Sequence, residues 1–126
     1  MTLLQLFSTK KTGDDAERIA ERFLLRHGLK LGARNYRCRH GEIDLIMQDS
    51  ETLVFVEVRL RKPLRGKVDF GGALASITAS KQAKIIATAQ HYLAGMKQLP
   101  PCRFDVVLLN GLNVQDVEWI RAAFDA

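Results

Sequence analysis

The order of hydrophobic and polar residues predicts an amphipathic helix near the start of the 126-residue chain. Its apolar positions recur at helical spacing and form one stripe, made of Ala16, Ile19, Ala20, Phe23 and Leu24. We expect the helix over residues 12–28, because Thr12 and Asp15 have the spacing of an N-terminal capping box and Gly28 suits a C-terminal stop. Glu17 then lies at the edge of the stripe, beside the core.

A β-hairpin follows this helix, after a short strand around residues 29–37. Residues 42–48 alternate between apolar and polar types, with Ile43, Leu45 and Met47 on one face. Residues 49–51 form the turn, and residues 52–61 form the second strand. One face of that strand is apolar (Val54, Val56, Val58 and Leu60), and the other carries Leu53, Phe55, Glu57, Arg59 and Arg61.

The second half of the chain predicts a loop, a helix and further strands. Residues 62–78 contain Pro63 and three glycines, which indicate an irregular loop. Residues 79–94 have the pattern of a helix that buries Ile85, Ile86, Ala89 and Leu93. Residues 103–109 form a strand with an apolar centre, and Asn110 and Gly111 form a hairpin turn. We expect one more short strand and a small terminal helix with Trp119, Ile120 and Phe124.

The element order is helix, three strands, helix and strand, which predicts an α/β domain with a mixed central sheet flanked by helices. The length suits a single domain over residues 1–126, and we expect residues 1–11 to be a flexible N-terminal segment. Apolar runs stay short and the first residues lack the pattern of a secretory signal, so we expect no membrane segment. The two cysteines, Cys38 and Cys102, lack metal-ligand spacing, and a reduced cytoplasmic protein is expected.

Positive charge is concentrated in two segments of the chain. The net charge is +5, but residues 26–40 and 59–67 together carry +10 and contain no acid, while the rest carries −5. Such a polarised domain favours a polyanion bound on one face. From charge alone, a solvated basic face and an acidic protein partner are the alternatives.

Two acids stand at unusual positions in the predicted hairpin. Asp44 lies within an apolar strand and Glu57 follows the apolar run LVFV, although a buried carboxylate without a partner is costly. In an antiparallel hairpin, the numbers of two directly opposed residues always have the same sum. With an even-length turn, for example 49–52, that sum is 101, so Asp44 lies opposite Glu57. Carboxylates about 5 Å apart repel, which raises a pKa unless a cation such as Mg²⁺ lies between them. An odd-length turn would place the two acids on opposite faces.

Cross-strand ion pairs are the second interpretation of these acids. The same register places Glu42 opposite Arg59, and Asp44 or Glu57 can pair with a nearby arginine. Glu17 is either a third carboxylate of the same site or a solvated residue at the core boundary. Lys81 in the first turn of the second helix opposes the helix dipole, and a phosphate held there by Lys81 and Gln82 would explain it.

Several segments of the chain resemble the YraN family of small bacterial proteins: AERIAERFLLRHG, ARNYRCRHGEIDLI, LVFVEVRLR, SKQAKI and CRFDVV. The resemblance runs from about Gly13 to Phe124, and its GEIDLI and VFVEV blocks are specific. The family is similar to the restriction-endonuclease-like, PD-(D/E)xK superfamily, which includes relatives of the archaeal-type Holliday junction resolvases. The resemblance implies an αβββαβ core and metal-dependent phosphodiester hydrolysis on DNA or RNA.

Carried over by position, the resemblance implies roles for individual residues. Glu17 is the acid of the first helix, Asp44 is the motif aspartate, and Glu57 is the glutamate of the E-x-K motif. Val58 lends its backbone carbonyl to the metal. Arg59 stands in the lysine position, and because an arginine keeps its proton it can only stabilise charge there.

The sequence therefore predicts an endonuclease that depends on Mg²⁺ or Mn²⁺ and cleaves structured, branched DNA in preference to RNA. The residues expected to contact the nucleic acid are Arg34, Arg37, Arg39, His40, Arg61, Lys62, Arg65, Lys67, Lys81 and Gln82. The alternatives are a non-catalytic nucleic-acid-binding module, a nuclease subunit completed by a protein partner in DNA processing, and an interaction protein with an acidic partner. A homodimer is left open, because resolvase-like relatives work as symmetric dimers.

Overall fold

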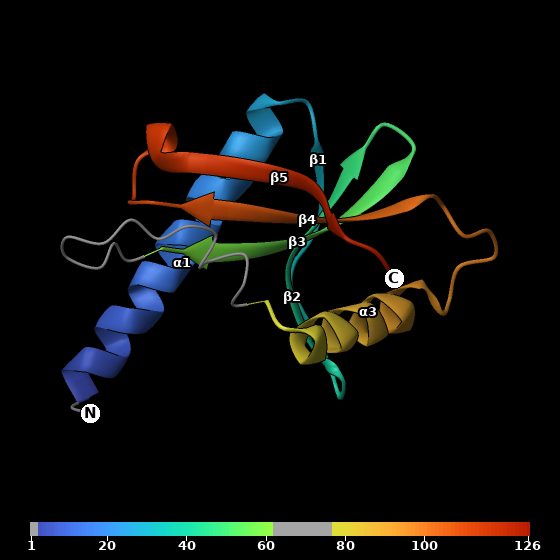
Figure 1. The fold of residues 1–126 in the computed structure, drawn as a ribbon, viewed down its shortest axis with the longest axis horizontal. Helices are drawn as coiled ribbons and strands as arrows, with labels where there is room; N and C mark the ends of the chain where they lie inside the picture. Colours follow the sequence, from blue (N-terminus) through green and yellow to red (C-terminus); the bar gives the residue numbers. More distant parts are fainter. Residues whose placement is uncertain (1–2, 62–76) are drawn as a thin grey trace.

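The computed structural model describes residues 3–61 and 77–126, with side chains from Gly13 onward. Within these ranges the elements are α1 (Leu3–Arg26), β1 (Lys30–Cys38), β2 (Gly41–Asp49), β3 (Thr52–Leu60), α3 (Ala79–Leu93), β4 (Cys102–Leu109), a 3₁₀ turn (Val114–Asp116) and β5 (Val117–Phe124). The predicted order of helix, three strands, helix and strand is confirmed (Figure 1).

The five strands form one mixed sheet in the order β1-β2-β3-β4-β5. Neighbouring strands are antiparallel except β3 and β4, which are parallel and are linked by the crossover that contains α3. The two helices lie on opposite faces of this sheet (Figure 1). The arrangement is an α/β fold, compatible with a restriction-endonuclease-like αβββαβ core.

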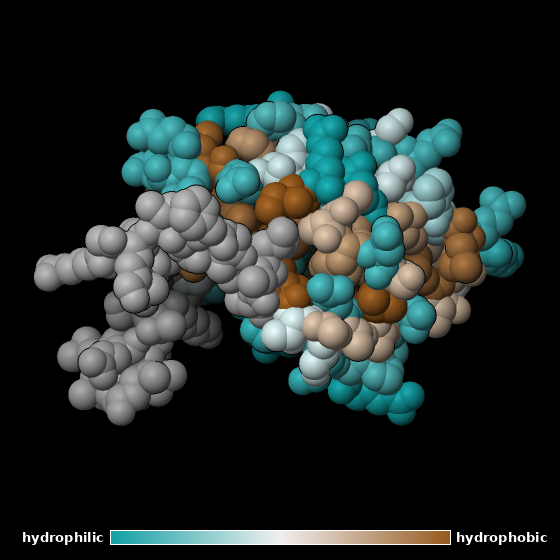
Figure 2. Space-filling view, in the orientation of Figure 1, coloured by the Kyte–Doolittle hydropathy of each residue, from teal (hydrophilic) through white to brown (hydrophobic). Residues whose placement is uncertain are grey.

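Alternation along β3 divides the core into two layers, as the sequence predicts. Val54 and Val56 pack against α1, whose buried stripe consists of Ala16, Ala20 and Leu24. Leu53 and Phe55 pack on the other face with Ile85 and Ala89 of α3. In the orientation of Figure 2, visible hydrophobic residues are spread from the upper left through the centre to the right of the surface, and hydrophilic residues lie along its upper and lower margins.

Two expected elements are corrected by the structure. The first helix begins at Leu3, so Thr12 lies inside it and is not its N-cap. The residues before Thr12 include strong helix formers, and these continue the helix past a local capping signal. The expected terminal helix is wrong, because Val117–Phe124 is a strand paired with β4.

The error at the C-terminus has a physical cause in a β-bulge. The register between β4 and β5 shifts between Phe104 and Val106, and Ala122 adopts a positive φ of 50°. The carboxylate of the fully buried Asp105 accepts hydrogen bonds from the Ala122 N–H and the Trp119 indole and so stabilises the bulge. The extra residue breaks the simple alternation that would have identified a strand.

The strand β2 also departs from simple alternation. Leu45 and Met47 pack on the α1 side, but Ile43, which was expected on the same face, packs on the α3 side. The pairing between β2 and β3 ends at Leu45 and Val56, while β2 continues to pair with β1. The two central strands therefore separate at Asp44.

No helix in the described part of the chain is long and apolar enough to cross a membrane. Cys38 and Cys102 are both free thiols.

Candidate active site

The register of the β2–β3 hairpin is the one that an even-length turn requires. Asp49 pairs with Thr52 and Leu45 pairs with Val56, so the residue numbers of each pair add to the predicted constant. The turn itself consists of Ser50 and Glu51, and Ser50 has a positive φ of 54°. Asp44 and Glu57 occupy the next position along the two strands, directly beyond the last backbone pair.

Asp44 takes the place of a backbone partner where the two strands separate. Its Oδ2 accepts a hydrogen bond of 2.8 Å from the Val58 N–H, and the residue is only 8% exposed. In an extended strand the N–H and C=O of one residue point to the same side. The Val58 carbonyl therefore faces the same gap between β2 and β3 as the Asp44 carboxylate.

Glu57 and Asp44 line a common cavity of about 270 Å³ between this gap and the first turns of α3. The cavity is lined by Gly41, Glu42, Asp44, Glu57, Arg59, Lys81, Lys84 and Ile85. The side chain of Thr78 caps α3 by accepting a hydrogen bond from the Lys81 N–H. This cap places Lys81 in the first turn of the helix, beside the acids.

Arg59 lies next to Glu57 without satisfying all of its own hydrogen-bond donors. Its Nε is 3.3 Å from Oε1 of Glu57, which is an ion pair but lacks the alignment of a hydrogen bond. Among the residues that the structure describes, the buried Arg59 Nε–H therefore has no hydrogen-bond acceptor. Because a buried donor without an acceptor is costly, this group fits a site that an anion completes.

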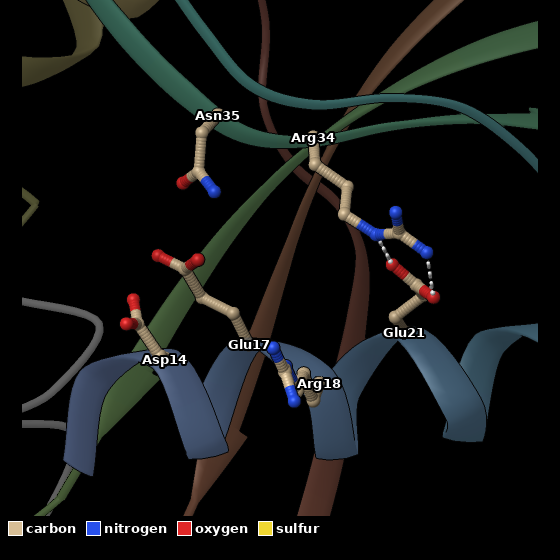
Figure 3. Close-up of a pocket in the computed structure, with 6 residues that line it drawn as sticks. All are labelled: Asp14, Glu17, Arg18, Glu21, Arg34 and Asn35. Carbon is tan, nitrogen blue, oxygen red and sulfur yellow. Dashed lines mark hydrogen bonds and ion pairs between the residues drawn. The ribbon is translucent and has the colours of Figure 1, made fainter. Parts of the chain in front are cut away.

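Glu17 reaches the same centre from α1. Its carboxyl group interacts with the carboxyl group of Asp44 and with the side chain of Asn35. Figure 3 shows Glu17 and Asp14 rising from α1 towards Asn35 of β1. These residues, with Arg18, Glu21 and Arg34, line a second cavity of about 200 Å³.

Asn35 is a site residue that the sequence analysis missed. The β1–β2 register places it opposite Asp44, and its φ is 49°. Asparagine tolerates this left-handed conformation better than most residues do, so an asparagine inside a basic strand is the one weak signal available. The local strain lies at the acidic centre, which is where strained residues tend to gather.

The three carboxyl groups have raised pKa values. Burial and then repulsion from Asp44 raise the pKa of Glu57 to about 7, although Arg59 and Lys81 attract its charge. Burial, Asp44 and Asp14 raise the pKa of Glu17 to about 7, and the Asn35 side chain opposes this. Burial and the charge of Glu42 raise the pKa of Asp44, whereas the Val58 N–H stabilises its charged form.

The donor set fits a hard divalent cation. Asp44 and Glu57 present carboxylate oxygens and Val58 presents a carbonyl, which are the ligand types that Mg²⁺ and Mn²⁺ favour. Within the described residues no three His, Cys, Asp or Glu side chains form a ready-made metal cage. A site of this kind needs only one or two carboxylates, because waters and phosphate oxygens supply the remaining ligands of Mg²⁺.

The basic and polar residues expected to bind nucleic acid have different partners in the structure. Arg34 is bound by Glu21, Arg37 pairs with Glu42 at 2.7 Å, and Arg39 contacts the His40 ring. The side-chain amide of Gln82 donates to the backbone carbonyl of Ile77, so Gln82 is used within the protein. Arg61 directly follows β3 and is half-buried, whereas Lys62, Arg65 and Lys67 lie outside the described residues.

The expected position of Glu42 opposite Arg59 is wrong. Glu42 pairs with Arg37 across β1 and β2, and Arg59 pairs with Glu57 on its own strand. The cause is the separation of β2 from β3 at Asp44, which leaves Glu42 paired with β1.

Comparison with known proteins identifies a family over most of the chain. Residues 16–109 match the model of the uncharacterised protein family UPF0102, and this range contains all three acids and Arg59. A UPF0102 protein of Nitrosospira multiformis is 58% identical over 113 residues, covering 90% of this chain and 92% of the relative. A UPF0102 protein of Nitrosomonas europaea is 55% identical over 118 residues, covering 94% and 97%. The chain therefore belongs to the UPF0102 family, which is the YraN family that its motifs resemble.

Proposed function

We propose that the protein is a metal-dependent endonuclease that hydrolyses phosphodiester bonds in nucleic acid. The observation that carries this proposal is that Asp44 lies beside Glu57, with which it lines a cavity, and also interacts with Glu17, and that all three carboxyl groups have raised pKa values. An arrangement of this kind is costly without a cation.

The proposed ion is Mg²⁺ or Mn²⁺, held by Asp44, Glu57 and the Val58 carbonyl. When bound, such an ion polarises a phosphoryl oxygen and lowers the pKa of a water ligand. Glu17 orients the attacking water from the α1 side, where it lies next to Asp44. The unsatisfied Nε–H of Arg59 and the ammonium group of Lys81 stabilise negative charge on the phosphoryl group.

The proposed substrate is structured, branched DNA in preference to RNA. The basic residues around the site contact phosphates, which fix position and carry no base sequence. Shape recognition fits this chemistry better than readout of base edges. A homodimer, as in the resolvase-like relatives implied by the sequence motifs, would place two such sites on one branched substrate.

The direct test is cleavage of labelled four-way junction, flap and duplex DNA in Mg²⁺ or Mn²⁺. We expect cleavage by the wild-type protein and loss of at least about a hundredfold in rate for Asp44→Asn and Glu57→Gln. Glu51→Gln is the matched control, because Glu51 is an exposed acid in the turn of the same hairpin. Cleavage that persists in both site variants would contradict the assignment.

A second candidate function is favoured by Arg59 itself. Arg59 forms an ion pair with Glu57 and cannot act as a base, which suits a nucleic-acid-binding module without turnover of its own, or a subunit completed by a protein partner. This function predicts salt-sensitive DNA binding that does not need a metal and is unchanged in Asp44→Asn. Loss of binding on removal of Mg²⁺ would exclude it.

A further inference from the structure

A cluster of arginines lies on the α1 side of the acidic centre, and it adds two arginines of α1 to Arg34, which the sequence analysis already assigns to nucleic-acid binding. Arg18 and Arg22 stand one helical turn apart on α1, and Arg34 faces them from β1. With Glu21, these side chains line a cavity of about 310 Å³, which we call the arginine cavity.

The charges in the arginine cavity are unbalanced. Glu21 is engaged by Arg34, whose Nε and Nη2 both donate to its carboxylate, the latter at 2.9 Å (Figure 3). Arg18 and Arg22 are exposed, and both attract the charge of Glu21, the same carboxylate that Arg34 binds. Like charges one turn apart on a helix repel, so an anion placed between them would be stabilising.

The arginine cavity adjoins the cavity that Glu17 lines. The cavity that contains Glu17 shares Arg18, Glu21 and Arg34 with it. Glu17 in turn interacts electrostatically with Asp44, which lines the cavity of Glu57. Lys81 and Lys84 of α3 also line that last cavity. Cations therefore lie on the α1 side and on the α3 side of the acids.

We propose that Arg18 and Arg22 bind phosphates of the nucleic-acid backbone on one side of the acidic centre, opposite the phosphates held by Lys81 and Lys84. This inference rests on the proposed function, because the ligand is the strand that the acidic centre would cleave. Guanidinium groups suit this role, since their planar donors bind phosphate oxygens in pairs. Arg34 stays bound to Glu21 and fixes β1 against α1.

The proposal defines the substrate further. Phosphates bound on both sides of the acids require a strand that continues in both directions from the cleaved bond. The chain would therefore cut within a strand and would gain little affinity from a strand that ends at the cleavage position.

The test measures the affinity of the protein for a fluorescein-labelled four-way DNA junction in EDTA. Fluorescence anisotropy reports the binding at each of a series of salt concentrations. Each lost phosphate contact lowers the slope of log affinity against log salt by about 0.9, so Arg18→Ala/Arg22→Ala should lower it by about 1.8. Affinity at low salt should fall by about tenfold or more. Arg18→Lys/Arg22→Lys should retain most of the slope, since the charge is kept.

The matched control is Arg26→Ala/Lys97→Ala, which removes the same charge from exposed positions outside the three cavities. Equal losses of DNA affinity and salt slope in the two double-alanine variants would overturn the proposal. Unchanged DNA binding in both variants would overturn it as well. A larger loss in the Arg18 and Arg22 pair supports it. Binding in EDTA is independent of cleavage, so a wild-type protein that binds through these arginines but never cleaves would contradict only the proposed endonuclease.

Discussion

The replacement of Glu57 by glutamine should stabilise the metal-free protein at alkaline pH. Glutamine keeps the shape of the side chain and removes the charge that burial and Asp44 disfavour. In the absence of a divalent cation, the ionised Glu57 is a cost to the folded state. The substitution removes that cost along with the ion pair to Arg59.

The magnitude follows from the pKa of the group. A pKa raised from 4.5 to about 7 in the folded protein corresponds to about 3 kcal/mol of unfolding free energy above pH 7. The Glu57 side chain is 17% exposed and its attraction to Arg59 is lost in the variant, so we expect a net gain of about 1–2 kcal/mol at pH 8.

The sign depends on pH. Because the folded pKa lies above the unfolded one, the contribution of Glu57 to stability is fully present below pH 4.5 and is lost as the pH rises through about 7. Urea unfolding in EDTA should therefore give similar stabilities for wild type and Glu57→Gln at pH 4.5, and a more stable variant at pH 8. Mg²⁺ at pH 8 should stabilise only the wild type, since a ligand that binds the folded state shifts the equilibrium towards it.

The control is Glu51→Gln, at the exposed turn of the same hairpin, which should show no difference that grows with pH. A Glu57→Gln variant that is less stable than the wild type at pH 8, or equally stable at both pH values, would refute the argument that this carboxylate is held at a cost.

Three further predictions concern the scaffold around the site. Asp105→Ala should lower the free energy of unfolding by about 3 kcal/mol in urea titrations, because it removes the buried acceptor of the Trp119 indole and the Ala122 N–H and leaves Arg103 with Asp49 alone. Thr78→Ala should cost about 1 kcal/mol through loss of the α3 N-cap, measured by thermal unfolding, and Thr78→Ser should restore it. Hydrogen bonding to Arg34 lowers the pKa of Glu21, so its contribution is present above pH 4.5 and lost as the pH falls. Glu21→Gln should therefore flatten the acid limb of a stability curve measured between about pH 5 and 3, and an unchanged limb would contradict this.

Much of the fold follows from local patterns in the sequence. The alternation along residues 52–60 and the even-length turn determine the β2–β3 register, and the structure has that register. The stripe of Ala16, Ala20 and Leu24 determines which face of α1 is buried. The C-terminal strand was missed because its bulge depends on Asp105, a contact between strands that no local pattern contains.

The candidate site was also predictable only as far as local patterns determine it. Register alone brings Asp44 and Glu57 to neighbouring positions, and helical spacing brings Glu17 to the edge of the core. The separation of β2 from β3 at Asp44 was not predictable, because it depends on the Asp44 side chain binding the Val58 N–H. Because the strands separate there, Glu42 forms its ion pair with Arg37, and Asn35 lies opposite Asp44. Both outcomes depend on tertiary structure.

The central claim is that these carboxylates share a cation, and a crystal soaked in Mn²⁺ and measured at an anomalous wavelength tests it most directly. We predict one strong peak between the carboxylates of Asp44 and Glu57, within about 2.2 Å of oxygen ligands that include the Val58 carbonyl. Density that is empty there, with Glu57 held by Arg59 and Asp44 held by Glu17, would contradict the claim.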